Sequence, residues 1–165
     1  MRIAALRMKS EKSNRQKGVL MTEHEKYRIK QLSIFSENRP GRLMDIAREM
    51  KAAGINILGF TIAEGSGYGV VRMLVDKPEK AHESLTAHGH AVKLTEVLAI
   101  NMEDKPGGLY DLTVLLRDAG INIEYAYGYR NPPSAVLIMR VEDIDKAIDV
   151  VFESGRQLLD TSHFK

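Results

Sequence analysis

The 165-residue chain is predicted to be an α+β protein built from two copies of one βαββαβ unit. The first observation behind this prediction is an internal repeat at a shift of 66 residues. ENRPGRLMD at residues 37–45 returns as EDKPGGLYD at 103–111, and GINI at 54–57 returns at 120–123. Sixteen of the 56 pairs between residues 37–92 and 103–158 are identical, whereas chance at ~6% per position would give about three.

The second observation is that apolar residues alternate between strand and helix periods in both copies. Residues 29–34 and 97–102 have the period of a strand. After the Pro-Gly pair, each copy shows an i, i+3, i+7, i+10 stripe typical of an amphipathic helix. Gly54 and Gly120 stand where a left-handed residue would end that helix. The stripes comprise Leu43, Ile46, Met50 and Ala53, and Leu109, Leu112, Leu116 and Ala119.

The third observation is that turn residues divide the rest of each copy in the same way. Residues 54–65 and 121–130 are expected to be second strands, 65–69 and 131–134 turns, and 70–75 and 135–141 third strands. A second helix follows in each copy, closed by a glycine, and short final strands are expected at 91–95 and 157–161. The order is that of the ferredoxin-like split βαβ unit, with helices on one face of an antiparallel sheet. Inward residues of the second helices are Ala81 and Leu85, and Ala147, Ile148, Val151 and Phe152; the closing glycines are Gly89 and Gly155.

The division of the chain follows from the repeat and from the charge distribution. We expect one domain at residues 26–95 and a second at 96–165, with the last strand of the first running nearly straight into the second, because residues 92–102 contain no Pro, Gly or Ser. Residues 1–20 carry six Lys and Arg against one Glu, which leaves the remaining 145 residues slightly acidic. Residues 1–25 are therefore interpreted as a disordered or non-native tail, and no nucleic-acid surface is expected on the fold.

Composition excludes several functional classes. The chain has no Cys, which rules out disulfides, thiolate nucleophiles and Cys-bound metals and favours a cytoplasmic setting. No apolar run approaches the ~20 residues of a membrane span. His82, His88 and His90 lack the spacing of metal ligands, so neither a metal nor a cofactor is expected.

The loop around the Pro-Gly pair offers a binding site for a carboxylate. Gly41, Arg42 and Leu43 should present backbone N–H groups at the positive end of a helix dipole. Asn38, or Asp104 in the second copy, could accept from the ammonium of a free amino acid. The same residues also suit a purely structural role, because Pro-Gly often begins a helix and Asn or Asp often caps one.

The combination of ENRPGRL, an amphipathic helix, GINI, an apolar strand and a second helix resembles the ACT domain, a small-molecule sensor of amino-acid metabolism. Ser36 and Met102 stand where the serine-sensing members have a His, which leaves the ligand open. The resemblance implies an effector held between two units, with residues 38–43 facing 122–125, or residues 104–109 facing 56–58; the first pairing is favoured. The implied effector-binding residues are Asn38, Arg39, Pro40, Gly41, Arg42, Leu43, Asn56, Asp104, Gly107, Gly108, Leu109, Asn122, Ile123, Glu124 and Tyr125.

The second strands also predict association. If Ile57 faces the helices, Leu58, Phe60 and Ile62 form an apolar stripe on the opposite face, which favours a homodimer unless a β-bulge intervenes. Tyr125, Tyr127 and Tyr129 alternate and should share the face of Ile123, where core or interface packing is favoured over ligand stacking.

The function expected from these features is non-catalytic and allosteric: binding of a free amino acid between paired units, with modulation of a partner enzyme of amino-acid metabolism. Two alternatives remain. One is a small hydrolase resembling acylphosphatases, with Arg39, Arg42, Asn38 and Asn56 holding an anion and a water. The other is an interaction module with no ligand. No membrane partner is expected.

Overall fold

A computed structural model describes residues 23–165 and confirms two βαββαβ units in one chain. The side chain of Asn131 lies outside this description. In chain order the elements are β1 (Ile29–Glu37), α2 (Arg42–Ala52), β2 (Ile57–Glu64), β3 (Tyr68–Val75), α3 (Pro78–Ala87), β4 (Ala91–Glu103), α4 (Gly108–Asp118), β5 (Ile123–Asn131), β6 (Ser134–Val141), α5 (Ile144–Glu153), β7 (Leu158–Leu159) and the 3-10 helix η1 (Thr161–Phe164).

The long strand β4 joins the two units into one antiparallel sheet. Its first half pairs with β1 from Ala91 to Val97, and its second half pairs with β6 from Leu98 to Glu103. The strand order is β2-β3-β1-β4-β6-β5, with β7 also paired to β4. The predicted straight junction between the copies is therefore confirmed. We call the part from β1 to the first half of β4 unit one and the part from the second half of β4 to η1 unit two.

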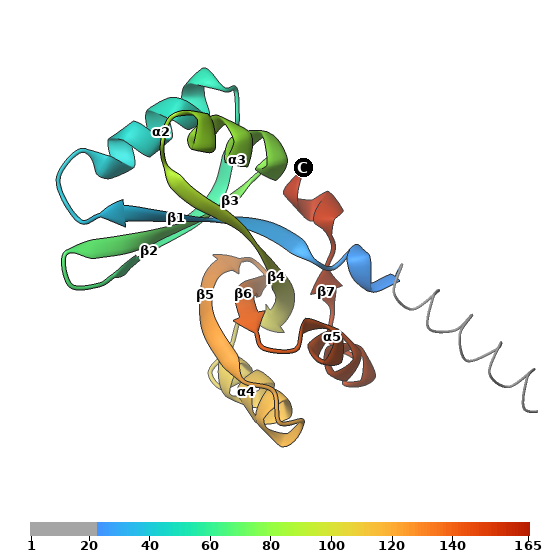
Figure 1. Cartoon of the computed structure of the whole chain (residues 1–165). Coiled ribbons are helices and arrows are strands. Elements are labelled where there is room, and N and C mark those ends of the chain that lie inside the picture. The colour runs from blue at the N-terminus through green and yellow to red at the C-terminus, as the bar shows by residue number, and fades with distance from the viewer. Residues whose placement is uncertain (1–22) are drawn as a thin grey trace, which may run out of the picture.

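Each unit buries one face of its strands beneath its own two helices. Figure 1 shows α2 and α3 on one outer side of the molecule and α4 and α5 on the other, with the strands between them. The stripe residues Ile46 and Met50 are buried in unit one, and Leu112 and Leu116 in unit two, as the helical period predicts. The helices therefore leave the opposite face of each sheet half uncovered.

A third apolar cluster lies between the units and packs the uncovered faces together. Side chains of β1, β3, β4, β6, β7 and η1 contribute to it, and Tyr125 and Tyr127 of β5 pack against it. Because burial of each large aliphatic side chain contributes about 1.5–3 kcal/mol, this cluster holds the units against each other. Its members are Ile29, Leu74, Val97, Ala99, Val136, Ile138, Leu159 and Phe164.

A β-bulge in β2 corrects the predicted facing of its apolar residues. The register shifts between Ile57 and Gly59, so that Phe60 lies opposite Met73 and Ile62 opposite Val71. Met73 and Val71 belong to the core beneath the helices, and directly opposed residues share a face. Phe60 and Ile62 therefore lie on the helix side, and they remain 52% and 50% exposed at the edge strand.

The equivalent bulge in β5 corrects the prediction for the tyrosines. Ile123 lies opposite Val141, which belongs to the core beneath the helices of unit two, but the register shifts before Tyr125. Tyr127 then pairs with Ile138, a member of the cluster between the units. The tyrosines thus leave the face of Ile123 and turn towards unit one.

The segment before β1 contacts unit two. Residues 23–25 form a helical turn, and His24 is buried with its two ring nitrogens 3.1 and 3.0 Å from carboxylate oxygens of Asp145 and Asp149. The tyrosine ring of Tyr27 meets Phe152 edge-on at 4.9 Å. The predicted disorder is therefore wrong for residues 23–25, and residues 1–22 lie outside the description.

The last strand of unit two is shorter than predicted. The final strand expected at residues 157–161 is limited to β7, because Thr161 already begins η1, where the Asp160 carboxylate accepts from Ser162 N–H at 2.8 Å.

Within residues 23–165, no helix combines the length and the apolar character needed to cross a membrane.

Candidate functional site

The loop between β1 and α2, which we call loop one, ends in a helix start that no side chain caps. Gly41 precedes α2 with φ 93°, a left-handed conformation that disfavours residues with a Cβ. No hydrogen bond within residues 23–165 uses the N–H of Gly41, Leu43 or Met44. Arg42 differs from the expectation, because its N–H donates to the carbonyl of Arg39 at 3.4 Å. Loop one therefore exposes three donors at the positive end of a helix.

The side chains of loop one leave Asn38 available. Glu37 accepts from Arg39 at 2.7 Å and from Arg42 at 3.3 Å, which occupies the acid of the loop. The backbone N–H of Asn38 donates to the carbonyl of Gly67 at 3.3 Å, which fixes the loop on the β2–β3 turn. The Asn38 amide itself has no partner among the residues that the structure describes. It can therefore accept from, or donate to, a ligand.

Loop two, between β4 and α4, repeats the backbone of loop one with different chemistry. Gly107 precedes α4 with φ 96°, again without a side-chain cap. At Gly108 a Cβ would stand 2.5 Å from the carbonyl oxygen of Glu103, whereas the equivalent position in loop one carries Arg42. Asp104 is ion-paired with Arg130 of the β5–β6 hairpin. Asp104, the acid predicted to bind an ammonium group, therefore already has a cationic partner.

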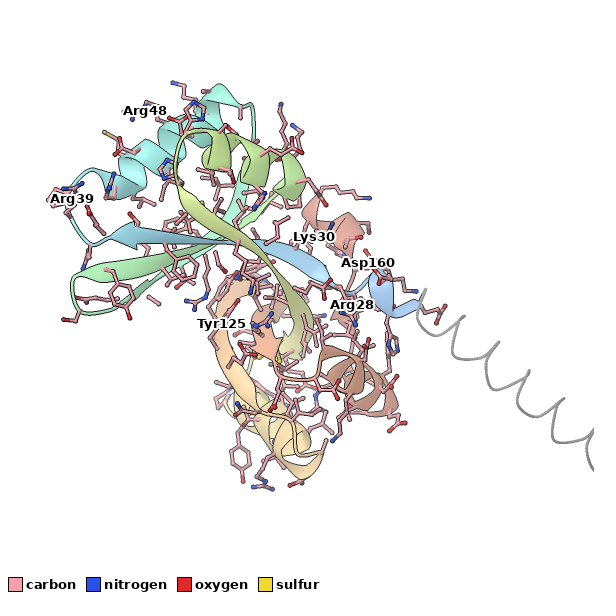
Figure 2. All side chains as sticks on the ribbon, in the orientation of Figure 1. Arg28, Lys30, Arg39, Arg48, Tyr125 and Asp160 are labelled. Atoms are coloured by element: carbon pink, nitrogen blue, oxygen red, sulfur yellow. The ribbon has the colours of Figure 1, made fainter. Side chains whose placement is uncertain are left out.

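The structure does not bring either loop to the second strand of the other unit. Loop one follows the pairing of Phe35 with Ala91 at the start of β4, and loop two follows the end of β4. The start of β5 instead lies level with the middle of β4, about seven residues or ~23 Å along the strands from loop one. Figure 2 shows Arg39 at the outer edge of unit one, far from Tyr125 near the middle of the molecule. The predicted facing of residues 38–43 and 122–125 is thus not formed within one chain, nor is that of 104–109 and 56–58.

The predicted groups on β5 are engaged elsewhere. Glu124 is ion-paired with Arg140 at 2.8 Å. The Tyr125 hydroxyl accepts from the amide of Gln31 at 2.8 Å, and the Arg72 guanidinium lies 3.9 Å above the Tyr125 ring. These contacts give Tyr125 a role in joining the units.

The two GINI asparagines hold the starts of the second strands. The backbone N–H of Asn56 donates to the Asp76 carboxylate at 2.9 Å, and this bond lowers the pKa of Asp76. The carbonyl of Asn122 accepts from Glu142 N–H at 3.2 Å. Asn56 pairs near Val75, seven residues along β3 from the Tyr68 that faces loop one. The hydrolase alternative therefore loses its residue set, because Asn56 lies far from Arg39 and Arg42.

A hollow of about 680 Å³ beside loop two contains residues that the sequence did not single out. Asn101 donates through Nδ2 to Gln157 Oε1 at 3.1 Å, and its Oδ1 is buried without a partner within residues 23–165. Arg156 also lines the hollow. The sequence signals for this hollow were Asp104 and Gly108, predicted site residues that line it, and Gly155, which aligns with Gly89 in the repeat. Among the residues described, no group of three or more His, Asp or Glu could hold a metal ion.

Comparisons with known proteins agree with this architecture. A family model described as an ACT domain pair matches residues 27–164. A crystal structure of a protein from Bacteroides thetaiotaomicron is 35% identical, with a TM-score of 0.80, and the match covers 84% of this chain and 96% of that one. The regulatory subunit of aspartate kinase from Thermus thermophilus is 15% identical, with a TM-score of 0.60 over 79% of this chain and 95% of that one, and shares the fold. No curated protein matches the chain significantly. The chain belongs to the ACT domain pair family.

Proposed function

We propose that this ACT domain pair is a non-catalytic regulatory protein that binds a free amino acid at loop one and passes its occupancy to an enzyme of metabolism. The observation that carries the proposal is the uncapped start of α2, where the N–H groups of Gly41, Leu43 and Met44 have no partner within residues 23–165. Asn38 adds an amide without a partner beside them.

The chemistry of loop one suits the backbone end of an amino acid. A carboxylate would accept from the free N–H groups of Gly41 and Leu43, where the dipole of α2 favours negative charge. The Asn38 side-chain oxygen would accept from the ammonium. Because a serine-sized amino acid has about seven heavy atoms, binding cannot exceed about 10 kcal/mol at the ceiling of ~1.5 kcal/mol per atom. We therefore expect dissociation constants between about 1 μM and 1 mM.

Closure of this site calls for a second copy of the chain. The strand that the family resemblance places opposite loop one lies about 23 Å from it in the same chain. β2 is an edge strand, and the exposed apolar side chains around it gather on the same side as α2. Such a surface favours association. The residues concerned are Leu43 and Met44 of α2 and Leu58, Phe60 and Ile62 of β2.

Regulation would follow from the position of the ligand between two copies. A ligand that binds one arrangement of the copies better than another shifts the population by that difference in affinity, commonly about 1–3 kcal/mol. The likeness to an aspartate kinase regulatory subunit supports a separate regulatory chain. The partner proposed here is accordingly an enzyme of amino-acid metabolism.

A thermal-shift screen of the twenty amino acids on the purified chain tests the proposal. We expect one or two amino acids to raise Tm in the wild type and to have no effect on Gly41→Asp, whose carboxylate repels the ligand. Asn38→Ala should reduce the shift. Gly107→Asp, the same change in loop two, is the matched control and should keep it. A screen in which no amino acid raises Tm contradicts the proposal.

A further inference from the structure

The face of unit one that lies opposite α2 and α3 is covered in part by unit two, and it carries a polar row across four strands. Thr61 pairs with Arg72, Arg72 with Ser33, and Ser33 with Lys93. Because directly opposed residues share a face and neighbouring strands lie ~4.8 Å apart, the two cations stand on either side of Ser33 with Cα atoms about 10 Å apart. We call these four residues the cation row.

Neither cation of the row is paired with an acid, although Arg72 lies over the Tyr125 ring. Within residues 23–165, no hydrogen bond or ion pair involves the side chain of Arg72 or Lys93. The Arg72 Nε atom is buried and unsatisfied, and its guanidinium carbon lies 3.9 Å from the centre of the Tyr125 ring. Arg28 and Arg140, by contrast, are each paired with carboxylates. An arginine held in place by an aromatic ring with free N–H groups is suited to grip an anion.

The face around the row supplies no competing acid. Fifteen positions of β1–β4 share this face between residues 31 and 97, and Glu37 is the one acid among them. Glu37, at the end of β1, already holds Arg39 and Arg42. The potential over the row is therefore positive. The fifteen positions are Gln31, Ser33, Phe35, Glu37, Gly59, Thr61, Ala63, Tyr68, Val70, Arg72, Leu74, Ala91, Lys93, Thr95 and Val97.

An apolar row runs beside the cation row. Ala63 pairs with Val70, Val70 with Phe35, and Phe35 with Ala91. Phe35 is 51% exposed. On the other side of the cation row, the buried amide of Gln31 is already satisfied by Tyr125 and Tyr127. The cations of the row are thus not paired with an acid, and the exposed apolar surface beside them lies on the side of Phe35.

We propose that the cation row binds a small organic carboxylate with an apolar body and no ammonium group, such as an aliphatic 2-oxo acid. The carboxylate lies between Arg72 and Lys93, and the apolar body lies over Phe35. A free amino acid is disfavoured, because its ammonium meets two cations, and Glu37, the one carboxylate among the positions of this face, is already paired. The site is separate from loop one, whose free N–H groups belong to the start of α2.

Calorimetric titration of the full chain with a matched set of ligands tests the proposal. The probes are 4-methyl-2-oxopentanoate, 4-methylpentanoate and leucine, which share an apolar body and differ at the α-carbon. We expect both carboxylates without ammonium to bind, with an affinity that falls as KCl is raised, and leucine to bind at this site at least tenfold more weakly. Because leucine can also bind at loop one, all three titrations are run on Gly41→Asp as well, which should leave 4-methyl-2-oxopentanoate binding unchanged.

Four variants assign the binding to the row. Arg72→Met should weaken 4-methyl-2-oxopentanoate binding at least tenfold, and Lys93→Met severalfold. Arg72→Lys, which keeps the charge but not the two-pronged geometry, should fall between wild type and Arg72→Met. Arg48→Met is the matched control, because Arg48 lies exposed on α2 and pairs with Asp45, and it should bind like the wild type. Because Lys93 is exposed, Lys93→Met should stay folded and still test binding at the row if Arg72→Met unfolds.

Three results would overturn the proposal. The first is that the wild type binds neither carboxylate. The second is unchanged affinity in both Arg72→Lys and Lys93→Met, and the third is equal affinity for leucine in Gly41→Asp. Failure of the amino-acid screen at loop one, with 4-methyl-2-oxopentanoate binding intact, contradicts the proposed regulatory site and leaves the cation row standing.

Discussion

Loops one and two have the same backbone and differ in whether the side chain that could bind an ammonium group is already paired. Gly41 and Gly107 adopt φ 93° and 96°, and both helices begin without a side-chain cap. Asp104 of loop two is ion-paired with Arg130, whereas Asn38 of loop one has no side-chain partner within residues 23–165. Both units have therefore kept the uncapped helix start. Only in loop one is the neighbouring polar side chain, Asn38, left without a partner within residues 23–165.

The second strands show a similar division. On the face turned towards the other unit, β2 carries Gly59 and Thr61 where β5 carries Tyr125 and Tyr127. Tyr127 donates to Gln31 at 2.8 Å, and burial raises the pKa of Tyr127. Unit two thus supplies the tyrosines that help to join the units, while unit one keeps Phe35 and Lys93 exposed on the equivalent face.

The largest expected effect tests whether the two units unfold together. Ile46 and Leu112 occupy equivalent positions in the repeat, and both are fully buried. Replacing either with Ala should lower the free energy of unfolding by about 2–5 kcal/mol. Because the cluster between the units couples them, we expect one cooperative urea transition in each variant. Two separated transitions would show that the units are independent.

The next effect concerns the helix starts. Gly108→Ala places a Cβ against the Glu103 carbonyl and should cost about 1–3 kcal/mol, while Arg42→Ala at the equivalent position should change stability by less than about 0.5 kcal/mol. Urea unfolding measures both. Equal costs at the two positions would contradict the difference between the loops.

The junction between the units has an expected effect of similar size. Gln31→Leu removes the buried amide that is hydrogen-bonded to the Tyr125 and Tyr127 hydroxyls, and it should cost about 1–3 kcal/mol. A double-mutant cycle with Tyr127→Phe should give a coupling of about 0.5–3 kcal/mol. Additive changes in the free energy of unfolding would show that Tyr127 and Gln31 do not stabilise the junction together.

The smallest effect is pH dependence at two equivalent acids. Burial opposes the shift, but hydrogen bonds from Arg28 and His24 lower the pKa of Asp145; a hydrogen bond from Lys30 lowers the pKa of Glu79. A lowered folded-state pKa gives stability that is present above the unfolded value, near pH 4, and lost as pH falls below it. Because both acids are largely exposed, each should contribute less than about 1 kcal/mol.

Acid unfolding of Asp145→Asn and Glu79→Gln compares these two pairs. Asp145 accepts from Arg28 through both carboxylate oxygens at 2.7 Å, whereas Glu79 accepts once from Lys30 at 2.6 Å. Asp145→Asn should therefore flatten the pH dependence below pH 4 more than Glu79→Gln. The reverse order would place the stronger pair in unit one.

The sequence predicted the element order because the repeat and the apolar periods agree at every step. It did not predict which faces Phe60 and Tyr127 occupy, because one bulged residue inverts the facing of all residues after it. The pairing of Asp104 with Arg130 also escaped it, since that contact depends on how the β5–β6 hairpin folds back over loop two. The separation of loop one from β5 follows from the register of β4, which spans both units.

Backbone amide NMR during titration tests the proposed role of loop one most directly. The titrant is the amino acid that gives the largest thermal shift. We expect the amide signals of Gly41, Leu43 and Met44 to move in proportion to occupancy, and those of Gly107 and Leu109 in loop two to stay in place. Movement in loop two alone, or in neither loop while the ligand binds, would contradict an amino-acid site at the start of α2.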